Sequence, residues 1–389
     1  MRVTLSGLCS SLVGIGLARF AYTPLIPALI AAEWFPPGRA AYLGAANLAG
    51  YLAGALLARP IAARIRAATV LRAMMVLATA AFFACATPRS FVWYFVWRFA
   101  AGVSGGTLMA LAAPTVMPHV PPSRRGLAGG VIFTGVGLGI AASGTLVPLL
   151  LRMGLVETWC GLGVVALALT VLAWGGWPEQ PTGPALSSVR VDHRPGLALG
   201  ALYVEYGLDA AGLVPHMVFL VDFVERGLGR GLAVGASYWV VFGLGAMIGP
   251  VLAGQLADRI GFARAVRLAL LVQTAAVATL VVTAGPMALF VSSAVIGALV
   301  PGIVPLVLGR VHELIPGDPH RQAAAWSVTT VAFALGQAGA GYGFSFLYAH
   351  TGSYAALFAI AAVTLGTALA IDLAVALASP PAIRSRRHA

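Results

Sequence analysis

The sequence predicts an all-α membrane protein with twelve transmembrane helices in two six-helix halves that repeat in parallel. Three observations carry this prediction: the chain is too apolar for a water-soluble protein, it contains twelve long apolar runs, and one segment of the first half recurs in the second. A bilayer core about 30 Å thick needs roughly 20 residues of helix, and each run is of about that length.

The composition excludes a soluble globular protein. Of the 389 residues, 60% are hydrophobic and 9% are charged, whereas globular proteins carry roughly 25% charged residues. The net charge of +12 comes from 24 arginines and 12 acidic residues. These arginines form no basic patch set in polar surface, so no nucleic-acid partner is predicted. The three cysteines lie in apolar runs at no metal-ligand spacing, so neither a metal site nor another cofactor is expected.

The apolar runs are separated by charges or by clusters of Pro and Gly, and no soluble domain fits between them. The predicted spans are 6–32, 39–62, 68–87, 90–117, 125–151, 158–177, 196–222, 232–257, 265–284, 286–310, 323–349 and 353–378.

One longer polar connection divides the chain into two bundles. Residues 178–195 (PEQPTGPALSSVRVDHRP) are rich in Pro, Ser and charge, which predicts a cytoplasmic linker. It separates an N-terminal bundle at 1–177 from a C-terminal bundle at 196–378, and a basic tail follows at 379–389.

Arginine placement predicts the orientation. With the N-terminus inside, seventeen arginines fall on the cytoplasmic side, five on the opposite side, and two within spans. Short loops rich in arginine stay in the cytoplasm. Both termini of this multi-pass protein are therefore expected to be cytoplasmic.

An internal repeat links the two halves. Residues 52–64 (LAGALLARPIAAR) match 252–264 (LAGQLADRIGFAR) at seven of thirteen positions, including two arginines. Each segment ends the second span of its half and enters the following cytoplasmic loop. The halves therefore repeat in parallel, as after a duplication of six spans.

The loop of this repeat resembles the loop signature of the major facilitator superfamily, which has a Gly, an Asp-Arg pair, a second Gly and a basic residue. The second copy matches it, with the basic residue one place late, at Gly254, Asp258, Arg259, Gly261 and Arg264. The first copy keeps Gly54, Arg59 and Arg64, but Ala58 replaces the Asp and Ile61 the second Gly. The resemblance implies that these loops act as a gate.

Two further segments carry the resemblance. WRFAAGVSGG at 97–106 is similar to the fourth-helix motif of the superfamily and contains Arg98. The segments GIGLARFAYTPLIPALI and AAYLGAANLAGYLAGALLA are similar to the YbfB/YjiJ subgroup of bacterial transporters. The resemblance covers essentially the whole chain. It implies the superfamily fold around a central path, transport as the activity, and the bacterial inner membrane as the location.

Charges inside spans are the candidate coupling residues, because burying a charge in hydrocarbon costs several kcal/mol. Glu205 and Asp209 share one face of the seventh helix, and Gly212 and His216 continue that stripe. Two neighbouring carboxylates at low dielectric do not both ionise easily, so the pair is a candidate proton site. The alternative is that one acid pairs permanently with a cation while the other reaches water.

Arginines in the first and fourth helices complete the predicted coupling set. Arg19 lies at the height of the two acids when Pro27 is aligned with Pro215. Helices 1 and 7 face each other in the superfamily arrangement, so an ion pair of Arg19 with Asp209 or Glu205 is expected. That pair could transmit protonation or could be static. Arg98 resembles the superfamily arginine linked to proton movement; the alternative is a side chain that reaches the outer interface.

Other polar and aromatic side chains at helical spacing suit a cavity for a small organic molecule, although such residues more often pack in a core. The predicted substrate-binding residues are Tyr22, Asn47, His216, Tyr238, Trp239, Trp326, Thr330, Phe333 and Gln337.

Glycine and proline positions indicate close packing and bending. Small-xxx-small pairs let helices approach closely, and they occur at Gly50/Gly54, Gly102/Gly106, Gly135/Gly139, Gly245/Gly249 and Gly339/Gly343. Prolines can kink spans and free carbonyls, and they occur at positions 24, 27, 114, 148, 215, 250, 301 and 305.

The sequence therefore predicts a secondary active transporter, monomeric in the lipid bilayer, that exports a small organic molecule with protons as the coupling ion. Import of an organic anion through Arg19 and Arg98 is the rival. ATP-driven transport is not expected, because the chain has no phosphate-binding GxxxxGK[ST] motif and no lysine. An intramembrane enzyme would need His/acid pairs or a Ser/Lys dyad, and a sensor would normally append a soluble domain, so neither class is favoured.

Overall fold

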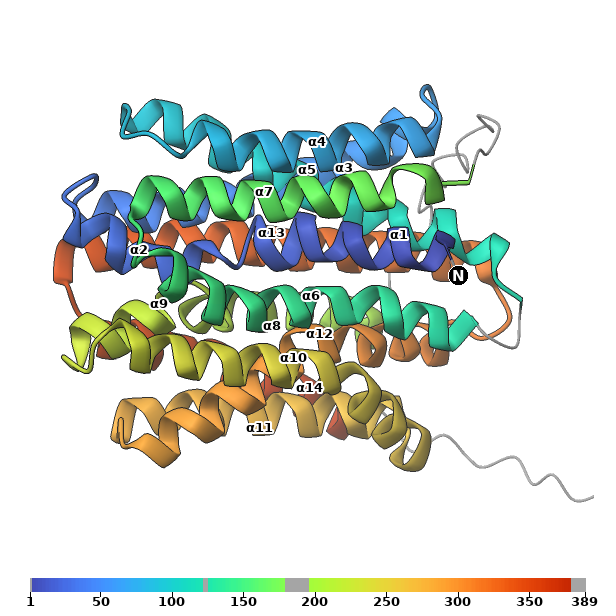
Figure 1. The fold of residues 1–389 in the computed structure, drawn as a ribbon. Coiled ribbons are helices and arrows are strands. Elements are labelled where there is room, and N and C mark those ends of the chain that lie inside the picture. The colour runs from blue at the N-terminus through green and yellow to red at the C-terminus, as the bar shows by residue number, and fades with distance from the viewer. Residues whose placement is uncertain (1, 122–124, 179–195, 379–389) are drawn as a thin grey trace, which may run out of the picture.

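The computed structural model describes residues 2–121, 125–178 and 196–378. Within these ranges the chain is almost entirely helical and contains no strand. The long helices lie side by side in one bundle (Figure 1). The first half contains α1 (Arg2–Ser11), η1 (Leu12–Leu17), α2 (Tyr22–Ala31), α3 (Pro37–Ala62), α4 (Ala67–Ala84), α5 (Phe91–Val116), η2 (Met117–His119), α6 (Arg125–Leu150), α7 (Leu155–Ala173) and η4 (Trp174–Gly176). The second half contains α8 (Leu197–Gly212), α9 (Val214–Asp222), η5 (Phe223–Gly227), α10 (Leu232–Ile260), α11 (Phe262–Val282), α12 (Pro286–Leu314), α13 (Pro319–Thr351) and α14 (Tyr354–Ala378).

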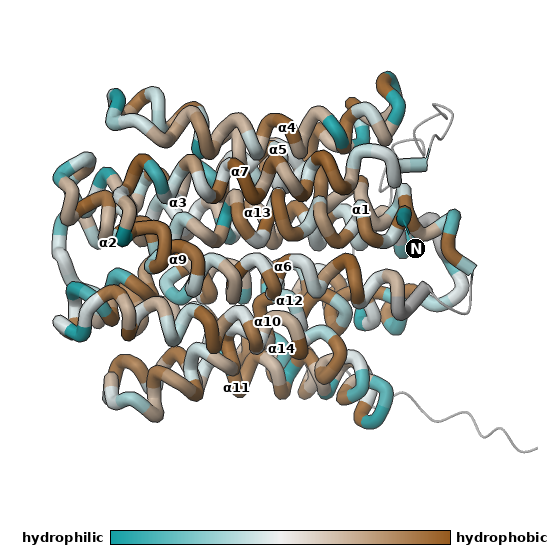
Figure 2. Tube along the Cα trace, viewed as in Figure 1, coloured by the Kyte–Doolittle hydropathy of each residue, from teal (hydrophilic) through white to brown (hydrophobic). Residues whose placement is uncertain are grey.

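The helices confirm the predicted membrane architecture. Eleven helical segments of the described ranges are long and apolar enough to cross a membrane, and they coincide with eleven predicted spans. The twelfth predicted span, 323–349, lies in α13, a helix of 33 residues that also carries polar side chains such as Thr330 and Gln337. Hydrophilic residues gather at the two ends of the bundle and hydrophobic residues fill its length (Figure 2). The predicted tail, and the linker beyond Pro178, lie outside the described residues.

The two ends of the bundle differ in charge. We call the end with Arg2 and the loops that follow α3 and α10 the arginine-rich end. The opposite end, which carries Arg39, Arg89 and Arg226, is the arginine-poor end. By the arginine distribution, the first of these is predicted to face the cytoplasm.

The first helix of each half is broken. In the first half a non-helical turn at 18–21 separates η1 from α2, and Pro24 and Pro27 follow it. In the second half α8 ends at Gly212 and α9 begins at Val214, with Pro215 directly after the break. Proline removes a helical hydrogen bond and restricts the residue before it, which explains both positions. The predicted kink sites Pro114, Pro148, Pro250, Pro301 and Pro305 all lie inside helices that continue through them.

Glycines let α3 pack directly against α5, as their spacing predicts. A methyl group added at Gly50 would overlap the carbonyl oxygen of Phe99, and one at Gly102 would overlap the carbonyl oxygen of Asn47. The second half repeats this packing between α10 and α12, where Gly249 lies against Ala298 and Gly297 against Phe242.

The Gly339/Gly343 pair does not form such a contact. A methyl group added at either position would meet no atom within 4 Å. The expectation of close packing there is wrong, because α13 turns the face with these two glycines away from its neighbours. The Gly135/Gly139 pair does pack closely, against Leu8 and Gly16 of the first helix.

The halves meet through α3 with α13 and through α6 with α10. Gly38 faces Ala349 and Gly341 faces Leu48, whereas Gly144 of α6 faces Ala236 and Val240 of α10. Gly38 and Ala349 lie at the arginine-poor ends of α3 and α13. The contact of Gly144 with Ala236 and Val240 joins the arginine-poor ends of α6 and α10. These contacts hold the halves together at the arginine-poor end.

Candidate functional site

Arg19 lies in the break of the first helix, at the interface between the halves. Its Nη2 atom is 3.5 Å from Met217 Sδ of α9. The guanidinium carbon lies 4.9 Å from the ring centre of Phe20 and 5.3 Å from that of Tyr51. Such cation–π contacts suit a cation with little water around it. Arg19 therefore reaches the second half through a thioether rather than through an acid.

Met217 joins the two broken helices. Thr23 Oγ1 donates a hydrogen bond to the Met217 carbonyl, and Gln337 Nε2 of α13 is 3.8 Å from Met217 Sδ. The Oε1 atom of Gln337 is buried and has no hydrogen-bond partner among the described residues. The structure thus brings Arg19 together with Gln337, one of the predicted substrate-binding residues.

Arg98 supports the break from within the first half. Its Nη1 donates a 2.8 Å hydrogen bond to the carbonyl of Ala18, in the non-helical turn. The guanidinium lies 4.2 Å from the centre of the Tyr22 ring, and Asn47 Nδ2 donates to the Arg98 carbonyl. Arg98 is 3% exposed, so its side chain turns inward and does not reach the outer interface. Tyr22 and Asn47 are therefore brought to Arg98 rather than to Gln337.

The acidic stripe on the seventh helix forms, but it faces the interior of the second half. Asp209 is 1% exposed and faces Gln273 of α11. Gly212 packs against Ala361 and Leu365 of α14. Neither carboxylate oxygen of Asp209 has a hydrogen-bond partner in the described part of the chain, and the same holds for both polar atoms of Gln273.

Glu205 lies one turn from Asp209 in a different electrostatic environment. It is 5% exposed and interacts with the charges of Asp372, Arg310 and Arg267. Asp372 of α14 forms an ion pair with Arg267 of α11. Glu205 is thus surrounded by charges of both signs, whereas Asp209 faces a neutral amide.

The expected ion pair of Arg19 with Glu205 or Asp209 is not formed. The ion pairs within the described ranges are Arg226–Asp222, Arg267–Asp372 and Arg310–Glu313. The acids face α11 and α14, whereas Arg19 contacts Met217 of α9. The spacing of the stripe was right, but its direction was wrong, because the periodicity of one helix does not determine which neighbour its polar face meets.

His216 continues the stripe in the same direction. Its Nε2 lies 2.8 Å from Ser292 Oγ of α12, and its ring packs edge-on against Phe358 at 5.1 Å. The side chain is fully buried. The His216 side chain therefore contacts α12 and α14, whereas the neighbouring Met217 contacts Arg19 and Gln337.

Of the other predicted substrate-binding residues, Trp239 is buried, whereas Tyr238, Trp326, Thr330 and Phe333 are partly exposed. Trp239 stacks on Phe242 at 4.8 Å, and its Nε1 donates to Ser143 Oγ of α6 across the halves. Tyr238 donates to the carbonyl of Pro286. On α13, Thr330 Oγ1 donates to the carbonyl of Trp326, and the Phe333 ring lies 4.6 Å from that of Tyr206.

The second copy of the repeated loop begins where α10 ends. Gly261 has a φ of +82°, a conformation that favours glycine, and it separates α10 from α11. The amide of Phe262 donates to Glu313 Oε1 of α12, and Glu313 also pairs with Arg310. The neighbouring Asp258, Arg259 and Arg264 are exposed, and Gly254 has open space around it.

In the first copy, Gly54 packs against Val103, whereas Arg59 and Arg64 are exposed. The gate function of both loops stays a prediction.

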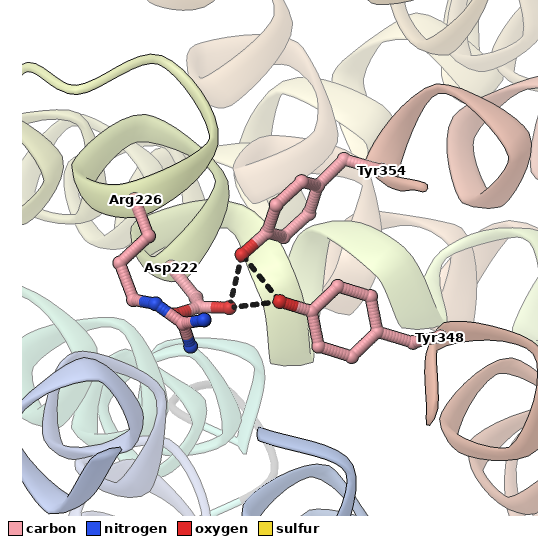
Figure 3. Close-up of polar contacts among 4 residues, drawn as sticks. All are labelled: Asp222, Arg226, Tyr348 and Tyr354. Atoms are coloured by element: carbon pink, nitrogen blue, oxygen red, sulfur yellow. Dashed lines mark hydrogen bonds and ion pairs between the residues drawn. The ribbon is translucent and has the colours of Figure 1, made fainter. Parts of the chain in front are cut away.

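A third polar cluster lies at the arginine-poor end, around Asp222 of α9 (Figure 3). Asp222 is fully buried; its Oδ1 is 3.2 Å from Arg226 Nη1, and its Oδ2 accepts from the hydroxyls of Tyr348 and Tyr354. The two hydroxyls are 2.6 Å apart. The cluster ties α9, η5, α13 and α14 together.

This cluster borders a cavity of about 630 Å³ between the halves. The first half lines it with Arg39 and Tyr42, among others, and the second half with Arg226, Tyr348 and Tyr354. The volume is within the range of small-molecule sites. Arg226 is paired with Asp222, whereas Arg39 forms no ion pair within the described ranges.

Replacing Asp222 with alanine is expected to lower the stability of the purified protein by about 1–3 kcal/mol, because Arg226 and two buried hydroxyls lose their acceptor. The measurement is thermal unfolding in detergent, followed by tryptophan fluorescence. Tyr354→Phe removes one hydroxyl and is expected to cost about 1 kcal/mol. Equal midpoints for wild type and Asp222→Ala would show that the cluster does not stabilise this end.

Sequence reasoning missed Asp222 and Gln273. Asp222 is the last residue of the predicted span 196–222, but the helical chain continues through η5 to Gly227. Gln273 was not among the polar residues named from the sequence, although Asn47 and Gln337 were. A neutral amide in the middle of the predicted span 265–284 was the available signal.

Comparisons with known proteins agree with this architecture. A family model described as uncharacterised MFS-type transporter YbfB matches residues 11–373. A D-xylose–proton symporter has a TM-score of 0.75 at 15% sequence identity, over 97% of this chain and 96% of that one. The xylose transporter XylE from E. coli gives 0.75 at 15% identity, over 96% and 98%. A bacterial homolog of the human lysosomal transporter Spinster, inward-facing and occupied, gives 0.71 at 15% identity, over 98% of both chains.

These structural similarities show a shared fold. Among curated proteins, no sequence relative was found. The family match spans nearly the whole chain and includes both broken helices. The chain therefore belongs to the YbfB family of major facilitator superfamily transporters.

Proposed function

We propose that this chain exports a small amphipathic organic molecule in exchange for protons, by alternating access of a site between its halves. The observation that carries the proposal is the meeting of the two broken helices through Arg19, Thr23 and Met217. Transporters commonly bind substrate where discontinuous helices meet near the middle of the membrane. Gly and Pro interruptions in corresponding helices of the two halves are the expected mark of such a site.

The side chains around this meeting point suggest the class of substrate. Tyr51 and Phe20 offer aromatic surface, and Gln337 offers an unpartnered amide oxygen. A ligand with an apolar body and a hydrogen-bond donor would complement them. The buried residues Tyr22, Asn47, His216 and Trp239 would contact it only after rearrangement. The further candidates for contact are partly exposed: Tyr238, Trp326, Thr330 and Phe333.

Asp209 is the proposed proton acceptor. Burying an ionised carboxylate without an ion-pair partner is unfavourable in free energy, and a bound proton removes this penalty because it neutralises the charge. Glu205, one turn away, is the proposed second member of the coupling set, and Arg98 supports the broken helix through Ala18. A proton-coupled sugar transporter of the same fold supports the proton as the driving ion.

Import of an organic anion is the second candidate, and the cavity at the arginine-poor end favours it. Arg39, which has no ion-pair partner in the described ranges, and Arg226 line this cavity. An anion entering from this side would meet both cations before it reached Arg19. This route requires the arginine-poor end to face away from the cytoplasm. The arginine distribution predicts that orientation, with both termini of the proposed monomer in the cytoplasm and the protein in the inner membrane.

Transport by sealed vesicles separates the two candidates. The purified protein is first screened for compounds that raise its unfolding temperature, and ethidium and benzoate serve as reference compounds for an aromatic cation and an aromatic anion. A stabilising compound is then added to vesicles that contain the protein and a pH-sensitive dye. Export by exchange predicts protons moving opposite to the compound; anion import predicts movement in the same direction. Movement of the compound that is indifferent to the pH gradient would contradict proton coupling.

A further inference from the structure

Asp209 and Gln273 present four buried polar atoms that form no hydrogen bond of normal geometry, although the two side chains are close enough to interact. Asp209 is 1% exposed and Gln273 is not exposed at all. The two side chains face each other between α8 and α11, yet the carboxylate oxygens, the amide oxygen and the amide nitrogen all lack a partner among the described residues. Each such buried atom costs about 1–3 kcal/mol, so their concentration at one place needs a physical reason.

The surroundings favour a positive charge at this place. Asp209 lies in the last turn of α8, whose C-terminal end carries a partial negative charge. Unwound carbonyls and helix C-termini hold cations in other transporters.

The neighbouring helices supply no cation for Asp209. Arg267 of α11 pairs with Asp372 of α14. The charges of Arg267, Asp372 and Arg310 of α12 act on Glu205. On α13, Gly336 and Phe333 face α8. On α8 itself, neither Tyr206 nor Glu205 can carry a positive charge. The positive charge must therefore come from outside the described side chains.

We propose that Asp209 and Gln273 form one binding site for a small cation, which lies between a carboxylate oxygen and the amide oxygen of Gln273. With Asp209 ionised, Gln273 Nε2 can donate to the carboxylate, but Gln273 Oε1 then has no donor opposite it. A proton on Asp209 allows the acid to donate to Gln273 Oε1 while Nε2 donates back, so the two groups satisfy each other. A sodium ion bound to a carboxylate oxygen and to Gln273 Oε1 would supply the missing positive charge instead.

This inference rests on the proton coupling proposed above, but it places the cation inside the second half rather than on the substrate path. It also assigns a role to Gln273, which orients the acid and does not touch substrate. Infrared difference spectroscopy of the full-length protein in lipid nanodiscs tests it without a transport assay, because a protonated carboxylic acid has its own carbonyl band.

The expected result is a carbonyl band of a protonated acid that disappears as pH rises and is absent from Asp209→Asn. In Gln273→Leu the band should shift to higher frequency and titrate at a different pH, because the acid has lost its hydrogen-bond partner. Glu157→Gln, which removes an exposed carboxylate in the first turn of α7, should leave the band unchanged. Gln273→Met, an unbranched apolar substitute, repeats the measurement should the leucine variant fail to fold.

A sodium arm identifies the cation. At fixed pH, replacing potassium chloride with sodium chloride should weaken the Asp209 band and raise the unfolding temperature if sodium enters the site, and should do neither in Asp209→Asn. An unchanged band in sodium assigns the site to the proton alone. Absence of any Asp209-dependent band at every pH, together with no sodium effect, overturns the proposal.

The test is independent of the proposed function. A site that binds a proton in a protein whose transport ignores the pH gradient would refute proton coupling and leave the site standing. Proton-driven transport without an Asp209-dependent band would refute the site and Asp209 as the proton acceptor, but not proton coupling.

Discussion

Asp209→Asn is expected to reduce proton-driven transport to the level of vesicles without protein. Asparagine keeps the size of the side chain and can still bond to Gln273, so the fold is preserved, but it cannot bind and release a proton. The variant should therefore behave as though permanently protonated. The measurement is dye-reported proton movement upon addition of a transported compound, with protein content matched to wild type.

Exchange of labelled for unlabelled compound separates loss of coupling from loss of folding. This exchange requires no net proton movement, so Asp209→Asn should retain it. Glu205→Gln is expected to impair coupling as well, since Glu205 shares the stripe. Glu157→Gln, which changes an exposed residue in the first turn of α7, should transport normally. Unaltered proton movement in both Asp209→Asn and Glu205→Gln would remove these acids from the mechanism.

Gly102→Val is expected to lower the stability of the protein strongly. Even one methyl group at position 102 would overlap the carbonyl oxygen of Asn47 on α3, and valine adds two more carbons. Overpacking of this kind costs about 1–3 kcal/mol and occasionally more. Separation of α3 from α5 would also disturb the hydrogen bond of Asn47 to Arg98, and with it the support of the Ala18 carbonyl.

Gly339→Ala is the matched control, because a methyl group there meets no atom within 4 Å. Its unfolding midpoint should stay within about 0.5 kcal/mol of wild type. Thermal unfolding in detergent and the yield of monodisperse protein report both variants. Equal behaviour of Gly102→Val and Gly339→Ala would contradict the close packing of α3 on α5.

The span boundaries were predictable because charges, Pro and Gly mark where hydrocarbon ends. Predicted 39–62 became Pro37–Ala62, and predicted 286–310 became Pro286–Leu314. Which prolines break a helix was not predictable: Pro215 follows a break, whereas Pro250 lies within a helix that continues. The outcome depends on neighbours, such as the Arg98 guanidinium that binds the Ala18 carbonyl freed at the first break.

The site was only partly predictable for a related reason. Spacing of 3.6 residues places Glu205 and Asp209 on one face, but the direction of that face is set by packing against α11 and α14. Arg19 and Gln337 were both named from the sequence, yet their link is Met217, an apolar residue that no charge-based search would select.

The burial of Asp209 against Gln273 has a consequence for how this transporter adapts. In the proposed mechanism the proton binds inside the second half and the substrate binds between the halves, so the two ligands do not compete for the same side chains. Substitutions between the halves are then expected to change which compounds are carried without changing the affinity for the proton. Substrate selectivity and ion coupling would evolve independently.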